Sequence, residues 1–212
     1  MNCPDNPGRP KRSRCHAFEK SAGLAGVVHR ENPPPPIAYT HSMLILMAGL
    51  PGTGKSTISH ALCAAVGGTV LNKDEVRAAL FSPPDIEYST QQDEFCMRVM
   101  LKVAGYLFRR DPARYIFLDG RTFSQRYQLE RATGFSRAIG QPWRIIECVC
   151  QDESARHRLS HDRSHPAANR DFALYLEVKA RFEEITLPKT RIDTDQPLED
   201  CIRLALAAIA QL

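Results

Sequence analysis

The sequence lacks a long apolar run, since no hydrophobic stretch in its 212 residues approaches the roughly 18 residues that a membrane-spanning helix needs. The seven cysteines form no C-x-x-C pair, which argues against a zinc ribbon or a thioredoxin-like site. Scattered thiols are typical of reduced, mostly buried cysteines. The basic N-terminus is followed by no apolar segment of the kind found in secretory signals. We therefore expect a cytoplasmic protein.

An excess of charge of one sign is also missing over most of the chain. The formal net charge is +4, and residues 1–42 carry +3 of it, from six basic and three acidic side chains. The remaining 170 residues carry only +1 and include the single tryptophan. A nucleic-acid groove needs clustered positive charge, so a nucleic-acid partner is possible but not favoured.

Residues 1–42 are proline-rich, with Pro33 to Pro36 in a row and no lasting apolar periodicity. We expect a disordered extension containing a short polyproline II spacer. It is either a basic docking arm or a dispensable extension, and composition favours the second. Met43 stands at the first expected strand, so we hypothesise that the natural start is Met43 and that the preceding segment is an over-long gene start.

The most informative stretch is a complete G-x-x-x-x-G-K-[S/T] pattern at residues 49–57. An apolar run at 43–48 precedes it and a helical apolar pattern follows it, as in a strand–loop–helix phosphate site. Its glycines allow backbone N–H groups to surround an anion, and its lysine and serine suit phosphate and Mg²⁺. The nine residues are Gly49, Leu50, Pro51, Gly52, Thr53, Gly54, Lys55, Ser56 and Thr57. This pattern predicts that the chain binds ATP with Mg²⁺.

Strand and helix patterns alternate from residue 43 to the end. Strands are expected at 43–48, 69–71, 115–118, 143–150 and 190–193, and helices at 55–66, 73–81, 91–110, from 124 to 139, from about 152, at 172–185 and from 198. This alternation predicts one α/β domain, residues 43–212, with a five-stranded parallel sheet covered by helices on both faces. In the helix 91–110, the apolar positions Phe95, Val99, Val103 and Leu107 step by four and form the expected inner stripe. Cys96, Met100, Ala104 and Phe108 flank this stripe.

Asp74 follows the second expected strand, and Arg77 lies one helical turn later. Ligands of open parallel sheets bind beyond the carboxyl ends of the strands. A carboxylate there can accept the proton of a substrate hydroxyl, and a nearby arginine can orient that hydroxyl. The alternative is that Asp74 only caps the helix that begins there.

Asp119 ends the third expected strand after four apolar residues, which is the Walker B arrangement. Together with Ser56 it is a candidate ligand of the Mg²⁺ shell, and the alternative is a turn-forming Asp-Gly pair. Arg121 and Thr122 follow and are candidates for the acceptor pocket. With Arg126 nearby, this side of the site is expected to be basic and to suit an anionic acceptor, although Arg126 is equally consistent with a solvated surface.

The segment 156–165 is dense in cations and predicts a small mobile lid at about 156–172. An arginine on a closing lid can stabilise the charge of a phosphoryl group in transfer. The candidates are Arg156, Arg158 and Arg163, with Arg170 weaker. His157, His161 and His165 are spaced by four, but no acidic or cysteine ligand completes a zinc set.

These motifs resemble the P-loop kinases with a nucleoside-monophosphate-kinase-like core. More narrowly, the chain resembles bacterial AAA-type ATP-binding proteins that share a core with polynucleotide 5′-kinase, gluconate kinase, chloramphenicol phosphotransferase and zeta-toxin kinases. The motifs are G-L-P-G-T-G-K-S-T at 49–57, L-N-K-D-E-V-R at 71–77, F-L-D-G-R-T-F at 117–123, and H-P-A-A-N-R at 165–170 followed by L-Y-L-E-V-K-A-R-F-E at 174–183.

The resemblance implies sheet order 2-3-1-4-5 and an adenine pocket near residues 193–197. It also implies that Lys55 and Ser56 contact ATP and Mg²⁺, that Asp74 is the base, and that Arg158 or Arg163 comes from the lid. The residues after the third strand, Gly120, Arg121 and Thr122, differ from the family pattern. They belong to the expected acceptor pocket, so the resemblance does not identify the acceptor.

Two classes of function follow. The first is an ATP-dependent kinase that transfers the γ-phosphate to an alcohol group of a small molecule or nucleotide. The second is a P-loop ATPase or regulatory nucleotide-binding module without transfer. The two differ at Asp74, which only the kinase requires.

Overall fold

The computed structural model describes residues 42–161 and 171–210. The extension at 1–41, and with it the docking-arm and gene-start hypotheses, lies outside the described residues. So do Arg163, His165, Arg170 and most of the expected lid. Among the described residues, no helix is long and apolar enough to cross a membrane.

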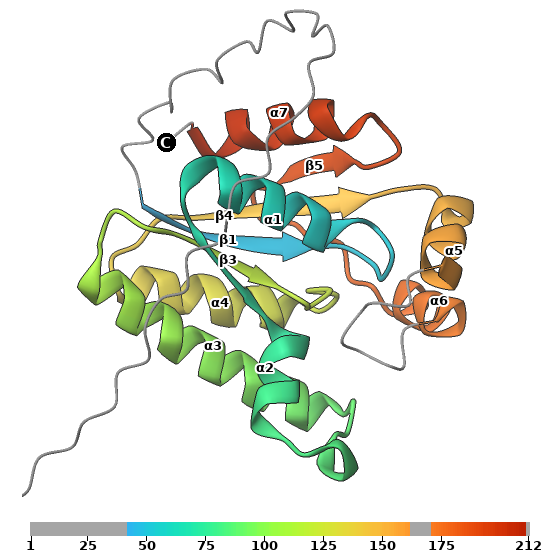
Figure 1. Cartoon of the computed structure of the whole chain (residues 1–212), viewed down its shortest axis with the longest axis horizontal. Coiled ribbons are helices and arrows are strands. Elements are labelled where there is room, and N and C mark those ends of the chain that lie inside the picture. The colour runs from blue at the N-terminus through green and yellow to red at the C-terminus, as the bar shows by residue number, and fades with distance from the viewer. Residues whose placement is uncertain (1–41, 162–170, 211–212) are drawn as a thin grey trace, which may run out of the picture. The chain divides into compact units, whose positions relative to one another are not determined.

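Five parallel strands form one sheet in the order β2-β3-β1-β4-β5, which confirms the expected topology (Figure 1). The strands are β1 (Met43–Ala48), β2 (Thr69–Asn72), β3 (Tyr115–Asp119), β4 (Trp143–Val149) and β5 (Thr190–Asp193). The helices are α1 (Lys55–Val66), α2 (Lys73–Leu80), α3 (Thr90–Arg110), α4 (Arg126–Ala138), α5 (Asp152–His161), α6 (Phe172–Ala180) and α7 (Leu198–Ala210), with a short 3₁₀ turn η1 (Pro83–Asp85).

The central strand β1 is apolar throughout because both faces of the sheet are covered. Side chains alternate along it, so Leu44, Leu46 and Ala48 enter the core beneath α3 and α4, whereas Met43, Ile45 and Met47 pack against α1 and α7. Figure 1 shows these two helix pairs on opposite faces of the sheet. All six β1 side chains are fully buried, which holds the loop after β1 on a rigid base.

The inner face of α3 differs from the expected one. Phe95 and Val103 are 42% and 38% exposed, whereas Cys96, Met100 and Ala104 are fully buried. A step of four residues drifts around the helix by about 40°, so two adjacent apolar stripes satisfy the same pattern. Phe95 instead packs edge-on against Phe81 at the end of α2, with ring centroids 5.8 Å apart.

Two further boundaries differ from the sequence pattern. Aspartate is a favoured N-cap, but Asp152 lies in the first turn of α5, because Ala155 N–H donates to the carbonyl of Gln151 (3.0 Å). Helix α6 ends at Ala180 rather than near 185. The chain leaves the helix there so that Glu183 N–H can donate to Ser124 O at 2.8 Å. That contact fixes the loop before α4 next to α6.

Candidate active site

The phosphate loop lies where β1 passes into α1, at the carboxyl edge of the sheet. Gly49, Gly52 and Gly54 all have positive φ angles, of 130°, 77° and 80°. A Cβ on Gly49 would lie 2.2 Å from the Cys148 carbonyl oxygen on β4, so the loop packs directly on the neighbouring strand. Only glycine tolerates both the backbone angle and the close approach. The conformation is therefore built into the loop sequence.

Two side chains complete the loop. Lys55 Nζ donates to Leu50 O at 2.7 Å, which holds the amino group over the loop, and Thr53 Oγ1 donates to the same carbonyl at 2.8 Å. Gly54 ends the loop as the N-cap of α1, and the first turn of that helix carries no acidic residue. Free helix N–H groups and one lysine thus present positive charge, as an anion requires.

Asp119 ends β3 beside this loop and is completely buried. Its Oδ2 accepts a hydrogen bond from Asn72 Nδ2 at 3.0 Å, and no hydrogen bond reaches its Oδ1 within the described structure. A buried carboxylate oxygen without a protein donor suits a hydrated cation. Ser56, which lines the adjoining cavity, offers a hydroxyl of the same hard-oxygen type. Ser56 and Asp119 therefore fit a Mg²⁺ ion.

Asp74 does not cap α2. The cap is Asn72, whose side chain accepts from the N–H groups of both Asp74 and Glu75. The Asp74 carboxylate, 9% exposed, instead accepts from Arg77 at 2.5 Å and lies 3.5 Å from Lys73 Nζ. The capping alternative is wrong, and the carboxylate is free to face the cavity.

A cavity of about 470 Å³ joins these elements. One wall is the phosphate loop with Lys55 and Ser56, and another is the start of α2 with Lys73 and Asp74. Its remaining wall comes from the β3–α4 loop, the beginning of α3 and the inner side of α6. The residues of that wall include Tyr88, Thr90, Asp93, Gly120, Arg121, Thr122, Ser124, Gln125, Tyr127, Gln128, Leu174, Val178 and Arg181.

The structure brings most of the sequence candidates to this cavity. Arg158 is not in the cavity lining but contacts the phosphate loop, where its Nη1 donates to Gly52 O at 3.5 Å. The Arg158 guanidinium donates to Thr194 O at 2.8 Å and Thr194 Oγ1 at 2.9 Å, and it reaches Asp195 at 3.3 Å. It therefore ties α5 to the loop after β5. Its role as a lid residue stays a prediction. His157 and His161 stack on each other, with ring centroids 4.3 Å apart.

The cations of the acceptor side are paired with acids that the sequence did not indicate. Arg121 does line the cavity, but its guanidinium pairs with Glu94, as does that of Arg131. Arg126 is absent from the cavity lining. Sequence reasoning missed Asp93 and Glu94, which lie on consecutive positions of α3 and belong to no recognisable motif. Only their place in the first turns of a helix is visible in the sequence.

Burial keeps the cysteine nearest the phosphate loop uncharged. Desolvation raises the pKa of the Cys148 thiol to about 12, and the positive charge of Lys55 only partly opposes this effect. Cys148 lies in the core between α1, α7 and the sheet, as expected for a packing residue. It therefore supplies no nucleophile at neutral pH.

The comparisons with known proteins agree with this geometry. A family model described as an AAA domain matches residues 44–185. The chain belongs to the AAA domain family. None of the curated proteins matches the chain in sequence.

Solved structures of kinases share the fold. A gluconokinase from Sinorhizobium meliloti superposes with a TM-score of 0.60 at 15% identity, over 82% of this chain and 93% of its own. A sugar kinase from a Janibacter species gives 0.57 at 18% identity, over 82% and 99%. The APS kinase of Mycobacterium tuberculosis, in complex with AMPPNP and APS, gives 0.60 at 16% identity, over 84% and 100%. The P-loop kinase fold expected from the sequence is confirmed.

Proposed function

We propose that the protein is an ATP-dependent kinase that transfers the γ-phosphate to an alcohol group of a small-molecule acceptor. One observation carries the proposal: the phosphate loop and the Asp74 carboxylate line the same cavity of about 470 Å³. A nucleotide-binding module needs the loop but has no use for a buried carboxylate opposite it. The kinases of similar fold support the same assignment.

In this proposal, backbone N–H groups at the end of the phosphate loop and at the start of α1, together with Lys55, bind the phosphates of ATP. Ser56 and Asp119 would hold Mg²⁺, which would neutralise phosphate charge. Asp74 accepts the proton of the acceptor hydroxyl. The hydroxyl oxygen forms a bond to the γ-phosphorus, and the bond from that phosphorus to the β–γ bridging oxygen breaks, so ADP leaves with the electron pair.

Arg77 and Lys73 act on Asp74 rather than on the phosphates. Arg77 is 2% exposed and donates to Asp74 Oδ1 at 2.5 Å, while Lys73 Nζ lies 3.5 Å from the same oxygen. In this proposal, the two contacts hold the Asp74 side chain in place beside the cavity. Arg77 is therefore a positioning residue, and Arg158 and Arg163 stay candidates for lid arginines that stabilise transferred charge.

The experiment is ATP consumption by the full chain with Mg²⁺ in the presence of single hydroxyl acceptors: sugars, sugar acids, nucleosides, oligonucleotide 5′ ends, and aminoglycoside or chloramphenicol-type antibiotics. Stimulation by one class, with phosphate recovered on that compound, is the expected result. ATP binding without phosphate transfer to any acceptor would favour the regulatory-module alternative. Absence of ATP binding would contradict the assignment of the phosphate loop.

A further inference from the structure

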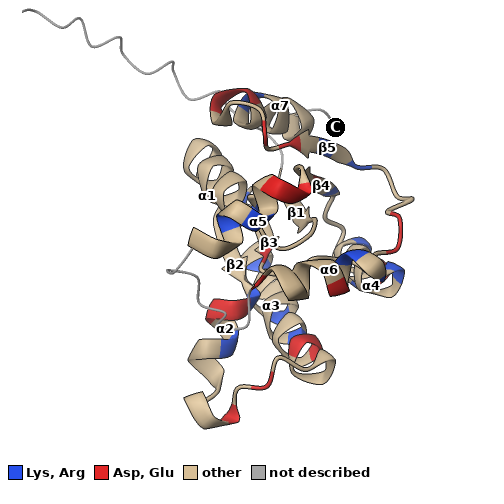
Figure 2. Ribbon diagram, turned by 90° about the vertical axis from the view of Figure 1, so that its right-hand side faces the viewer, with Lys and Arg blue, Asp and Glu red and all other residues tan. Residues whose placement is uncertain are grey.

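We call the part of the cavity built by α2, the start of α3, the β3–α4 loop and α6 the acceptor wall. The charged side chains in and directly behind it are paired with one another, with one cation in excess. Three carboxylates from α2 and α3 face four cations from α2, the β3–α4 loop and α4. The carboxylates are Asp74, Asp93 and Glu94, and the cations are Lys73, Arg77, Arg121 and Arg131. Figure 2 shows acidic and basic ribbon segments close to one another around α2 and α3.

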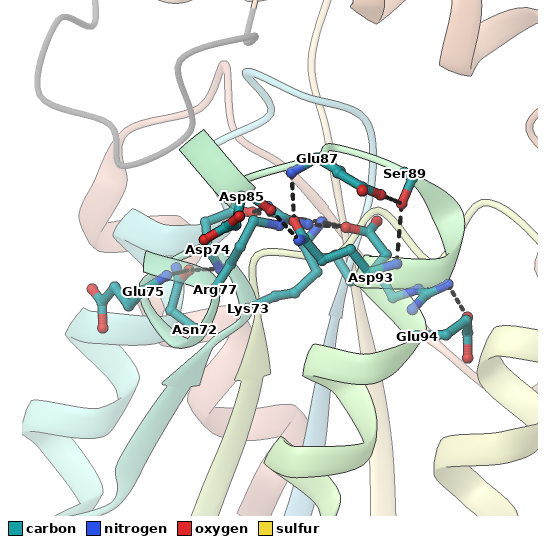
Figure 3. Close-up of polar contacts among 12 residues, drawn as sticks. Asn72, Lys73, Asp74, Glu75, Arg77, Asp85, Glu87, Ser89, Asp93 and Glu94 are labelled. Carbon is teal, nitrogen blue, oxygen red and sulfur yellow. Dashed lines mark hydrogen bonds and ion pairs between the residues drawn. The ribbon is translucent and has the colours of Figure 1, made fainter. Parts of the chain in front are cut away.

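Asp93 neutralises the cations nearest the catalytic carboxylate. Its Oδ1 accepts from Lys73 Nζ at 2.8 Å and also from the guanidinium of Arg77, which reaches Asp74 with its other nitrogen (Figure 3). The ring of Tyr88 covers the same guanidinium at 5.0 Å. Arg77 is therefore enclosed by two carboxylates and one aromatic ring, and an incoming anion would have to displace a buried ion pair.

Glu94 does the same for the next pair of cations along the wall. One of its oxygens pairs with Arg121, whose side chain is 4% exposed, and the other pairs with Arg131. Both oxygens of the carboxylate are thus used, and the charge of the buried arginine is balanced inside the protein. Two consecutive acids of α3 therefore pair with the cations of the part of the wall that the sequence alone suggested to be basic, and one positive charge is left in excess.

The uncharged residues of the wall favour an uncharged acceptor. Tyr88 and Tyr127 are 38% and 44% exposed, and each lines the cavity. Gln128 also lines the cavity, and its amide group can pair with a hydroxyl group of the acceptor. Half-exposed aromatic rings suit the face of a sugar or nucleoside ring.

We propose that the acceptor is a neutral, polyhydroxylated ring compound and that Asp93 and Glu94 exclude acceptors carrying a phosphate or carboxylate. This inference rests on the proposed kinase function, because it names the substrate class of the same cavity. Asp93 and Glu94 act on specificity through the cations that they hold, while Asp74 acts on the reacting hydroxyl.

Arg181 is the cation of the cavity lining that an anionic acceptor could bind most readily. It lines the cavity and pairs with Glu177 at 3.0 Å, but both side chains are about 60% exposed. Such an exposed pair is weak and an anion can compete for it. Any binding of an anionic probe must therefore be tested in Arg181→Ala as well.

The experiment measures binding to the full chain with the phosphate loop saturated by a non-hydrolysable ATP analogue and Mg²⁺. Two matched pairs of probes are titrated: glucose against glucuronate, and adenosine against adenosine 3′-monophosphate. The wild type is expected to bind the neutral member of one pair more tightly, and which pair responds separates a sugar from a nucleoside. Asp93→Asn and Glu94→Gln are each expected to increase affinity for the anionic members by at least about tenfold.

Matched variants separate charge from structural damage. Asp200→Asn removes a surface carboxylate that pairs with Arg203. This variant is expected to change neither the affinity for the neutral probes nor that for the anionic probes. The double variant Asp93→Asn with Lys73→Gln restores the zero net charge of the cluster that these residues form with Asp74 and Arg77. It is expected to lose the gain in affinity for the anionic probes. If Asp93→Asn fails to fold, Glu94→Gln tests the same claim.

Tighter binding of the anionic probe by the wild type, abolished by Arg181→Ala, would overturn the proposal. Unchanged anion affinity in both Asp93→Asn and Glu94→Gln would overturn it as well. Because these measurements record binding selectivity, they are distinct from the transfer assay that tests kinase activity. If the proposed kinase function is wrong, the transfer assay will show no phosphate transfer, whichever probe the cavity binds more tightly.

Discussion

The two main walls of the cavity are built differently. The phosphate loop is a continuous stretch, residues 49–57, in which the backbone does the binding and the glycines set its path. The acceptor wall is assembled from side chains of α2, α3, the β3–α4 loop and α6, and ion pairs set its charge. The comparison teaches that the nucleotide side is encoded locally, whereas the acceptor side depends on which distant segments the fold brings together.

The largest expected effect concerns charge on the loop. Lys55→Met removes the amino group that would contact the transferred phosphate, so kcat for phosphate transfer should fall by about 10²–10³. Lys102→Met, an equal change at an exposed position of α3, should leave kcat unchanged. Steady-state kinetics of both variants check this prediction. Equal kcat values for Lys55→Met and the wild type would contradict the assigned role.

The backbone of the loop is tested by Gly49→Ala. The new Cβ would meet the Cys148 carbonyl oxygen at 2.2 Å in a backbone conformation unfavourable for alanine, so the free energy of unfolding should fall by about 2–4 kcal/mol. Gly134→Ala is the control, since it lies within helix α4 with nothing near its Cβ position and should stabilise by about 0.5–1 kcal/mol. Urea denaturation measures both, and equal effects would contradict the packing argument.

The acceptor wall is tested by the stability of Glu94→Gln. Arg121 is 4% exposed and loses its carboxylate partner, so the free energy of unfolding should fall by about 2–3 kcal/mol. In Glu153→Gln the corresponding pair with Arg156 is more than half exposed and separated by 3.6 Å, so the change should be under about 0.5 kcal/mol. A destabilisation of similar size in both variants would remove the distinction between buried and exposed pairs.

The smallest effect is a pH dependence at the α5–α6 contact. Hydrogen bonds from Lys179, and then from Tyr175, lower the pKa of Asp152 below its usual 3.8. A lowered folded-state pKa means that the contribution to stability is present above pH 3.8 and is lost as the pH falls through the folded value. The Tm difference between the wild type and Asp152→Asn should therefore shrink below about pH 4. A difference independent of pH would contradict the ionic nature of the contact.

Sequence reasoning succeeded where structure is determined locally. The run 43–48, the loop 49–57 and the alternation of strands and helices predict the parallel sheet and the position of Asp119 at the end of β3, while the strand order came from the resemblance to P-loop kinases. It failed on α3, because two neighbouring apolar stripes fit the same spacing and only packing decides between them. It also did not indicate that the cations of the acceptor side are paired. The partner of Arg121 is Glu94, which lies 27 residues away in sequence and belongs to no motif. Ion pairs between distant segments leave no local signal.

The most direct test of the central claim is phosphate transfer by Asp74→Asn, measured beside the binding of a non-hydrolysable ATP analogue. Asparagine keeps the shape of the side chain but cannot take the hydroxyl proton. The account predicts that transfer falls by about 10²–10⁴ while the analogue's Kd stays within about threefold of the wild type. Transfer at the wild-type rate with unchanged nucleotide binding would contradict it, because the acceptor wall would then contain no base at Asp74.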